Sequence, residues 1–509
     1  MSNLSGYDSE VVGFESVTRN KSSESDNGTQ TSEFAEVGAS SQTNLSVDSG
    51  CNVTPEDLNV TESVLRQYPP PGLNGFLRRV VPAMMDQLNQ NDKEIIDNSS
   101  DSDDEELVSA KLFQEVEVKT EHRLGSGDHQ SPCVLSLSWS SAGNSLAVSI
   151  GYTHHENWCE HDGLIRIFTV KRTAGDKLVQ ALDITEKNCV SLVQYHPSVA
   201  ALLAYATTSG EVVICNLRNS LDYHEGAQLT SPSGCHGSKR VSALLWADQS
   251  LANIFLTMQI KNTGKRRGAA DQILFSSGSD GTINVWQVNS SSKVFENVVS
   301  YAVNGSRKLA TPDITCFDFI KSYPLRPSDD KVADDVFVVG TKSGALYLCR
   351  TKSCRQIAGS NVLDPVYEVL EGHSTCILEV AFSLQRPGVF ASVSIDSELK
   401  VYDMNQAAPL KVICLDVPIS SMCWLPNNPS VVVLGLAADP QRKHSLAVYN
   451  VCSGRTLPVD GFAGEGTVTS LSVNQSGSCR IAAGDSASIV RVWDLPSRKI
   501  RLSSEDLEF

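Results

Sequence analysis

The stretch that decides the fold is "VTSLSVNQSGSCRIAAGDSASIVRVWDL", residues 468–495. Its first part alternates apolar and small polar residues and runs into an Asn-Gln-Ser-Gly turn. A strand of small residues follows, then an Asp-Ser-Ala-Ser turn, and a last strand that closes on Trp493. Alternation with a period of two, bounded by turn residues, is typical of β-strands. The stretch therefore predicts three short strands joined by tight turns.

The same pattern occurs six more times before residue 468. These earlier units lie at 134–170, 190–217, 241–288, 314–350, 377–404 and 419–451. Periodic units of short strands are the signature of a β-propeller. We therefore predict an all-β fold, a seven-bladed propeller over residues 112–503. Closure of the ring removes exposed sheet edges and needs a strand from outside the local order. We expect "FQEVEVK" (113–119) in that place, with "RKIRL" (498–502) as the alternative.

Several units end in motifs of the WD-repeat type. "VWDL" (492–495) matches fully, whereas "VWQV" (285–288), "VYDM" (401–404) and "VYNV" (448–451) are degenerate. The fifth unit also has a Gly-His pair before its first strand. Four of its residues match the buried hydrogen-bonded set of WD repeats: His373, Ser394, Asp396 and Tyr402. Because buried polar groups are normally hydrogen-bonded, we interpret His373 as structural and not as catalytic.

Charge and composition exclude several classes of partner. The formal net charge of the 509 residues is −17, which argues against nucleic acid and anionic membranes. The one basic cluster, 261–267, is better interpreted as a solvated loop than as a phosphate or nuclear-import site. No apolar run is long enough to span a membrane, and the N-terminus has no signal-peptide core. The 14 cysteines form no CxxC pair, so we expect a soluble protein of a reducing, intracellular compartment.

The segment "THHENWCEH" holds the most enzyme-like cluster of side chains. His154, His155, Cys159 and His161 are all residue types that bind zinc. The segment falls in a hairpin loop of the first unit, and its irregular spacing matches no usual ligand pattern. No motif of a nucleotide-binding loop, hydrolase or metalloprotease occurs in the chain. We therefore expect no metal, no cofactor and no enzymatic activity.

Before the propeller the chain divides into three segments. Residues 1–62 are polar and predict a disordered tail, because they cannot bury enough apolar surface to fold. Residues 63–92 carry a helical signal, and 93–111 form an acidic linker; a short C-terminal tail is expected at 504–509. The tail contains two alternating peptides that suit addition as a β-strand to another protein. They are Thr29-Gln30-Thr31 and the looser Ser41-Gln42-Thr43. Chance occurrence in a Ser/Thr-rich tail is the alternative.

The helical segment has a continuous apolar stripe at steps of three and four residues. The stripe consists of Leu73, Phe76, Leu77, Val80, Val81, Met84, Met85 and Leu88. Pro82 should kink the helix or divide it. A helix between disordered segments has no core of its own to cover, so we expect it to dock in a groove of another protein. The alternative is that it folds back on the propeller.

This order of parts resembles the dynein intermediate chain family, most closely the intermediate chains of the cytoplasmic dynein-2 of intraflagellar transport. "FLRRV" (76–80) and "AAGDSASIVRVWDL" (482–495) carry the resemblance best. It implies that the propeller binds a dynein heavy chain. It also implies that Thr29–Thr31 and Ser41–Thr43 bind the TQT-type light chain, and that the stripe binds a roadblock-type light chain. Further implied partners are a Tctex-type light chain and a second intermediate chain.

The resemblance further implies retrograde transport in cilia, with the protein in the cytoplasm and cytoskeleton, the cilium and its axoneme, and the basal body or centrosome. A dynactin role is not implied, because the chain has no Lys/Glu-rich N-terminal coiled coil. Three alternatives stay open. The chain could be an axonemal dynein intermediate chain, a WD-repeat substrate adaptor of a ubiquitin ligase or signalling complex, or an enzyme whose chemistry maps to the loop at 153–161.

Overall fold

The structure, a computed structural model, describes residues 80–81, 108–118 and 131–506. The last range has gaps at 154, 156–158, 160, 172–175, 219–227, 264–267, 269, 305–310, 322–334, 358, 427 and 475–478. The chain divides into two units, residues 1–104 and 105–509. Val80 and Val81 are the described residues of the first unit, and both are helical.

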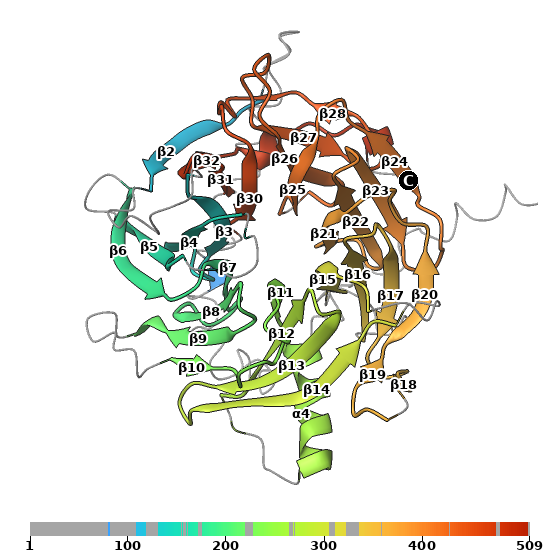
Figure 1. The fold of residues 1–509 in the computed structure, drawn as a ribbon. Helices are drawn as coiled ribbons and strands as arrows, with labels where there is room; N and C mark the ends of the chain where they lie inside the picture. Colours follow the sequence, from blue (N-terminus) through green and yellow to red (C-terminus); the bar gives the residue numbers. More distant parts are fainter. Residues whose placement is uncertain are drawn as a thin grey trace, which may run out of the picture. The chain divides into compact units, whose positions relative to one another are not determined.

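The second unit is a ring of seven small antiparallel sheets around a central axis (Figure 1), which confirms the predicted seven-bladed β-propeller. Blades one and two contain β3 (Cys133–Trp139), β4 (Ser145–Gly151), β5 (Gly163–Lys171), β6 (Lys177–Glu186), β7 (Val190–Tyr195), β8 (Leu202–Thr207), β9 (Val212–Asn216) and β10 (Leu229–Thr230). Blades three and four contain β11 (Val241–Trp246), β12 (Gln272–Gly278), β13 (Thr282–Asn289), β14 (Val294–Ala302), β15 (Ile314–Phe319), β16 (Val336–Thr341), β17 (Leu346–Arg350) and β20 (Val366–Leu370).

The remaining blades continue the same order. Blades five and six contain β21 (Ile377–Phe382), β22 (Val389–Ser394), β23 (Glu398–Asp403), β24 (Lys411–Cys414), β25 (Ile419–Trp424), β26 (Val431–Leu436), β27 (Leu446–Asn450) and β28 (Thr456–Leu457). Blade seven contains β30 (Val468–Val473), β31 (Arg480–Asp485), β32 (Ile489–Asp494) and β2 (Lys111–Glu117). In every blade the first strand of the repeat lies next to the central channel (Figure 1), and the innermost strands of neighbouring blades contact one another all the way round.

Blade seven takes its outermost strand from the start of the propeller unit. β2 pairs antiparallel with β32, from Lys111 opposite Asp494 to Glu117 opposite Ile489. The Val118 N–H continues the pairing, because it donates to the Ser488 carbonyl at 2.9 Å. The expected closing strand at 113–119 is confirmed, with its start two residues earlier. The alternative segment forms no strand: Ser497–Lys499 is a 3₁₀ helix, η5, and 500–502 have no regular structure.

A second short pairing holds the beginning of the propeller unit. β1 (Val108–Ser109) runs parallel to β29 (Val459–Asp460), which lies after blade six, and Ala110 N–H donates to the Asp460 carbonyl at 2.8 Å. Gly461 has φ +95°, and a Cβ there would lie 2.1 Å from the Ala110 carbonyl oxygen. Only glycine fits such a position. The folded unit therefore already begins within the segment expected as the linker 93–111.

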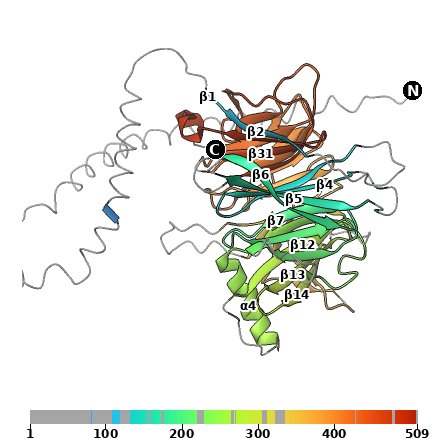
Figure 2. The same ribbon diagram turned by 90° about the vertical axis from the view of Figure 1, so that its left-hand side faces the viewer.

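Blade three carries two features that the repeat pattern did not predict. Helix α4 (Gln249–Thr263) is inserted between β11 and β12 and projects from the ring (Figure 2). Its last turn includes residues 261–263, so the expected basic loop starts inside a helix. The hairpin β18 (Arg355–Gln356) and β19 (Leu363–Asp364) follows β17 of blade four, yet β19 pairs with β14 of blade three. The hairpin therefore links two neighbouring blades.

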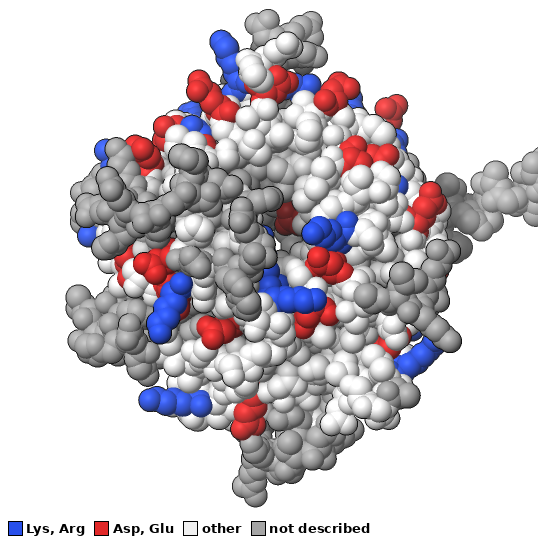
Figure 3. Space-filling view, in the orientation of Figure 1, with Lys and Arg blue, Asp and Glu red and all other residues white. Residues whose placement is uncertain are grey.

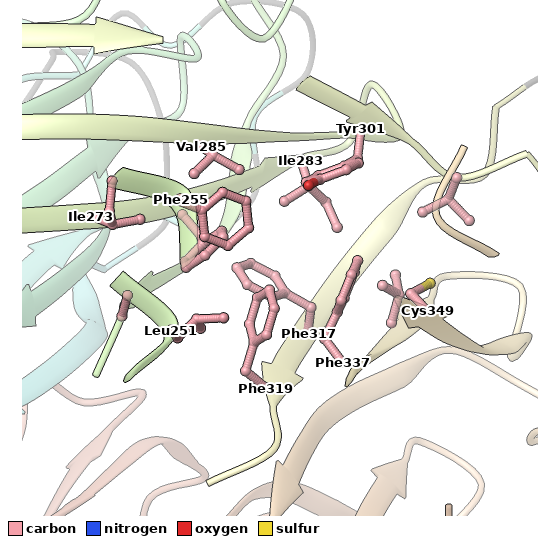
Figure 4. Packing of buried hydrophobic residues seen from close by; sticks show 14 of the residues in the cluster. Leu251, Phe255, Ile273, Ile283, Val285, Tyr301, Phe317, Phe319, Phe337 and Cys349 are labelled. Carbon is pink, nitrogen blue, oxygen red and sulfur yellow. The ribbon is translucent and has the colours of Figure 1, made fainter. Parts of the chain in front are cut away.

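An aromatic cluster anchors α4 and fills the space between blades three and four (Figure 4). Phe255 of α4 packs against Phe275 of β12, with ring centroids 5.2 Å apart. Phe275 in turn contacts Phe319 of β15 at 4.5 Å, and Phe319 stacks on Phe337 of β16 at 4.7 Å. Aromatic pairs at these separations are worth about 0.5–1.5 kcal/mol each beyond their buried area. The insertion is thus part of the core and not a surface appendage.

Residues 504–506 are the described part of the expected tail at 504–509, and they are folded. Ser504–Asp506 forms a 3₁₀ helix, η6, and Asp506 is fully buried. Arg455, which follows β27, holds the Asp506 carboxylate through an ion pair, with Nε at 3.0 Å from Oδ1. Burial alone would raise the pKa of Asp506, but hydrogen bonds from Arg455 and Ser503 outweigh it and lower the pKa well below the usual value. The segment is folded because the ionised, buried carboxylate of Asp506 needs a charged partner, and Arg455 supplies it.

Candidate interaction and ligand sites

The predicted hydrogen-bonded set of blade five is present, with one correction. His373 Nε2 lies 2.7 Å from the hydroxyl of Ser392, not of Ser394. The Nδ1 atom of the same ring lies 3.4 Å from Asp396 Oδ1, and Tyr402 donates its hydroxyl hydrogen to the Glu371 carbonyl at 2.7 Å. Ser394 instead donates to the Cys376 carbonyl at 2.8 Å. Ser392 and Ser394 are two residues apart on β22 and share one face, so alternation alone did not separate them.

The electrostatics of His373 agree with a structural role. Its side chain is buried, and burial lowers its pKa by more than the nearby Asp396 carboxylate raises it. The imidazole is therefore neutral near pH 7 and accepts or donates hydrogen bonds without a charge. His373 lies in the turn before β21, and its partners come from β22 and from the turn before β23, so the set connects three segments of one blade.

Blade three holds a second such set that was not predicted. His236 Nε2 lies 2.8 Å from Ser276 Oγ, and the indole N–H of Trp286 donates to the same oxygen at 2.8 Å. Asp280 Oδ1 lies 3.3 Å from His236 Nδ1. The spacing could have revealed it: the Ser, Asp and aromatic residues lie four and six residues apart, as Ser392, Asp396 and Tyr402 do.

Blade seven has the best WD motif but lacks this set. The same spacing counted back from Trp493 places alanine at 483 and at 487, where blade three has serine and aspartate. Trp493 is 1% exposed, and its indole N–H has no hydrogen-bond partner. The motif is therefore no guide to where the hydrogen-bonded set occurs, and blade seven depends instead on packing and on its closing strand.

The His/Cys loop of blade one gives a different result from the sequence analysis. Three of the four residues singled out there, His155, Cys159 and His161, come together, and Cys189 from the turn before β7 joins them. One possible ligand atom from each of the four lies within 4.8 Å of the others. His154 lies outside the described residues. Cys189 was not among the candidate ligands, and it is fully buried.

A hollow of about 350 Å³ lies at the central channel. Its described lining comes from the innermost strands and from the loops beside them, and consists of aliphatic and hydroxyl side chains together with Arg240. Arg240 is the one ionisable residue among the described lining residues. Burial lowers the pKa of its guanidinium, yet arginine keeps its proton in proteins. The described lining thus holds no carboxylate, histidine or cysteine that could act as a general base for its hydroxyl groups.

Charges of both signs are interspersed on the face drawn in Figure 3. Among the described residues on that face, lysine and arginine do not merge into a continuous basic area. A binding surface for a nucleic acid backbone needs such an area. Within the described parts of the chain, every helix is too short or too polar to cross a bilayer.

The predicted binding segments of the N-terminal part lie outside the described residues, with two exceptions. These segments are Thr29–Thr31, Ser41–Thr43 and the stripe positions Leu73, Phe76, Leu77, Met84, Met85 and Leu88. Val80 is half-buried and Val81 is 44% exposed, and both are helical.

Comparison with known proteins finds similar chains that are all named as dynein intermediate chains. The chain is 21% identical over 488 residues to the cytoplasmic dynein 2 intermediate chain 2 of Mus musculus, which covers 92% of this chain and 83% of the mouse protein. The protein of the same name from Homo sapiens is 22% identical over 443 residues, covering 84% and 77%. The ciliary dynein intermediate chain 2 of Heliocidaris crassispina is 22% identical over 315 residues, covering 60% and 39%. No protein-family model matches the chain.

The chain is therefore similar to dynein intermediate chains over most of its length. Residues 108–509 are about four fifths of the chain, so a match over 92% of it includes part of the segment before residue 108. The similarity to the cytoplasmic dynein 2 chains thus extends beyond the propeller.

Proposed function

We propose that the protein is the intermediate chain of a cytoplasmic dynein-2 motor and acts as a non-catalytic assembly subunit in retrograde intraflagellar transport. One observation supports this most: the similarity to cytoplasmic dynein 2 intermediate chains covers 92% of the chain and not merely the propeller. WD-repeat propellers alone occur in proteins of many functions. A similarity that includes both the N-terminal segment and the propeller is more specific than a propeller alone.

In this proposal the propeller binds the heavy chain, and the N-terminal segment binds the light chains. Thr29–Thr31 and Ser41–Thr43 each add a β-strand to the TQT-type light chain, and alternate side chains fill its pockets. Such light chains are dimeric and bring two intermediate chains together. Two weak peptide contacts then reinforce each other, because the first raises the effective concentration of the second. The stripe Leu73–Leu88 binds the roadblock-type light chain, and a Tctex-type light chain is a further partner.

The way in which the chain enters the ring supports a role in transmitting force from the N-terminal segment to the propeller. The N-terminal segment continues directly into β1 and β2, which pair with β29 and β32. A pull on the N-terminal segment therefore acts on the strand that closes the propeller. Gln114 of β2 also holds blade one, because its amide accepts from Leu178 N–H at 2.7 Å and donates to the Leu178 carbonyl at 3.1 Å. Force passes in this way into two neighbouring blades.

The central hollow supports a non-catalytic role, since Arg240 is the one ionisable side chain among its described lining residues. We place the protein in the cytoplasm and in the cilium with its axoneme, and at the basal body or centrosome. An axonemal dynein intermediate chain is the second candidate, because the relatives include ciliary and flagellar chains. Those matches cover 39% and 43% of the relatives, which favours the cytoplasmic dynein-2 assignment.

Imaging of the labelled full-length protein in ciliated cells separates the two candidates. A dynein-2 subunit moves along the cilium in transport trains, and its loss leaves train material at the ciliary tip. An outer-arm subunit is stationary along the doublets. A static signal along the axoneme, with normal retrograde velocities after depletion, would overturn the proposed function in favour of the axonemal one.

A further inference from the structure

We infer that His155, Cys159, His161 and Cys189 form a structural zinc site that joins blade one to blade two. The site is independent of the proposed motor function. It lies where the loop between β4 and β5 meets the turn between β6 and β7. These two segments touch directly: a Cβ on Gly163 would lie 2.2 Å from the Asn188 carbonyl oxygen. The Cys189 N–H also donates to the Cys159 sulfur at 3.1 Å.

The arrangement of the four side chains suits tetrahedral coordination. Zinc binds cysteine sulfur at about 2.3 Å and histidine nitrogen at about 2.0–2.1 Å, so ligand atoms of a tetrahedral site lie about 3.3–3.8 Å apart. The four candidate atoms already lie within 4.8 Å of one another. Their separations therefore exceed the tetrahedral range by about 1–1.5 Å at most.

Two nitrogen atoms at the site lack a partner. His155 Nε2 and His161 Nδ1 are both buried, and neither makes a hydrogen bond within the described parts of the chain. A buried polar atom without a partner costs about 1–3 kcal/mol, and two in one loop are unusual in a native structure. Each has a lone pair in the tautomer that places the proton on the other ring nitrogen. A metal ion is one partner that both atoms can share.

The choice of metal follows from the ligands. Two thiolates and two imidazoles are soft and borderline donors, which suit zinc and exclude calcium and magnesium. Two thiolates also cancel the charge of the divalent ion, so the site is neutral where Cys189 is fully buried. Four protein ligands leave no open position for water, which makes the site structural and not catalytic. Tyr152 covers it from one side, with its ring 4.1 Å from that of His161.

The zinc site would fix a loop at the rim of the central hollow. Leu135, which packs against Cys189, and Thr153, which lies two residues before His155, both line that hollow. The loop between β4 and β5 is long for a hairpin. A metal ion that ties this loop to blade two reduces the conformational freedom of the loop in the native state. Loss of the metal should therefore loosen this face of blades one and two without opening the ring.

The test uses the full-length protein, purified under reducing conditions without chelators. Zinc content is measured by inductively coupled plasma mass spectrometry, and the protein is reconstituted with Co²⁺ to record its visible and near-ultraviolet absorption. The variants are Cys159→Ser and His161→Gln, both at half-buried positions, with Cys235→Ser as the control. Cys235 is a half-buried thiol outside the cluster, and it donates to the Gly210 carbonyl at 3.2 Å.

We expect about one zinc ion per chain in the wild type and in Cys235→Ser, and below about 0.1 in the other two variants. Cobalt should give the intense bands of a tetrahedral site with thiolate charge transfer, weakened in Cys159→Ser. A chelator should lower the melting temperature of the wild type and leave that of Cys159→Ser unchanged. Wild-type protein without zinc after dialysis against Zn²⁺ would overturn the inference. So would full zinc content in His161→Gln.

Discussion

Removal of β2 should open the propeller, whereas removal of everything before the folded unit should not. We compare two truncations, one that deletes residues 1–104 and one that deletes 1–118. The longer deletion removes the whole ladder with β32. It also removes Val118, which is 2% exposed, and the half-buried Phe113 and Val116, all packed in the core of blades one and seven. The Arg480 guanidinium, which lies 4.0 Å from the Phe113 ring centroid, loses this aromatic contact too but keeps its ion pair with Asp494.

The expected cost follows from these side chains. Full burial of a valine stabilises by about 1.5–3 kcal/mol, and each half-buried side chain contributes about half as much, which gives about 3–6 kcal/mol. Domains of this kind are stable by about 5–15 kcal/mol, so the loss removes a large part of the total. The exposed edge of β32 adds a site for aggregation. We expect deletion of 1–118 to give insoluble protein or a much lower melting temperature.

The assay is thermal unfolding followed by circular dichroism and calorimetry, with the deletion of 1–104 as the reference. A milder pair of variants reports on the same strand. Gln114→Ala removes both hydrogen bonds to Leu178 and should cost about 1–2 kcal/mol. Glu115→Ala breaks only the exposed ion pair with Arg491 and should cost less than about 1 kcal/mol. Equal melting temperatures for the two truncations would refute closure by β2.

Three further predictions concern the N-terminal segments and one half-buried acid. Gln30→Glu in a peptide spanning 25–34 should weaken binding to the TQT-type light chain by about 2 kcal/mol or more, because a charge must be desolvated; calorimetry that gives equal affinities would count against the strand-addition model. Phe76→Ala should abolish binding of the roadblock-type light chain, at a cost of a few kcal/mol, and leave the melting temperature unchanged. Retained binding with a lowered melting temperature would show instead that the helix packs on the propeller. Burial raises the pKa of Glu379 to about 7, so the folded state favours the protonated carboxyl group. The stabilisation from this group is therefore complete below about pH 4.5, and it is lost as the pH rises through 7. Glu379→Gln keeps an acceptor for the Met422 N–H, 2.7 Å away, and should be more stable than the wild type by about 1–3 kcal/mol at pH 8 and equal to it at pH 4; denaturant unfolding without a pH-dependent difference would exclude this.

The repeat could be predicted from the sequence because each blade is a local unit. Strands of one blade are neighbours in the chain, and alternation with turn residues marks each of them. The closing strand could be predicted too, since a ring of repeats needs one strand from elsewhere and few segments were free to supply it. Helix α4 was missed although its signals are present: Asp248 accepts from the Leu251 N–H at 2.8 Å as an N-cap, and Leu251 and Phe255 are four residues apart.

The sites were harder to predict because they depend on which loops meet. Cys189 lies 28 residues after His161, and no local spacing connects them. The contact exists because β6 returns the chain to the end of the blade where the β4–β5 loop lies. The serine partner of His373 was predicted two residues too far along the chain, at Ser394 instead of Ser392, for a similar reason. Which of the two serines the ring reaches depends on the position of His373 along β22, and strand alternation does not specify that position.

The measurement that tests the central claim most directly is affinity purification of the full-length protein from ciliated cells, with its partners quantified by mass spectrometry. The proposal predicts a dynein heavy chain in stoichiometric amount, together with TQT-type and roadblock-type light chains and a second intermediate chain. A parallel purification of Phe76→Ala should keep the heavy chain and lose the roadblock-type light chain. Cullin-type ubiquitin ligase subunits in stoichiometric amount, with no heavy chain and no light chains, would contradict it.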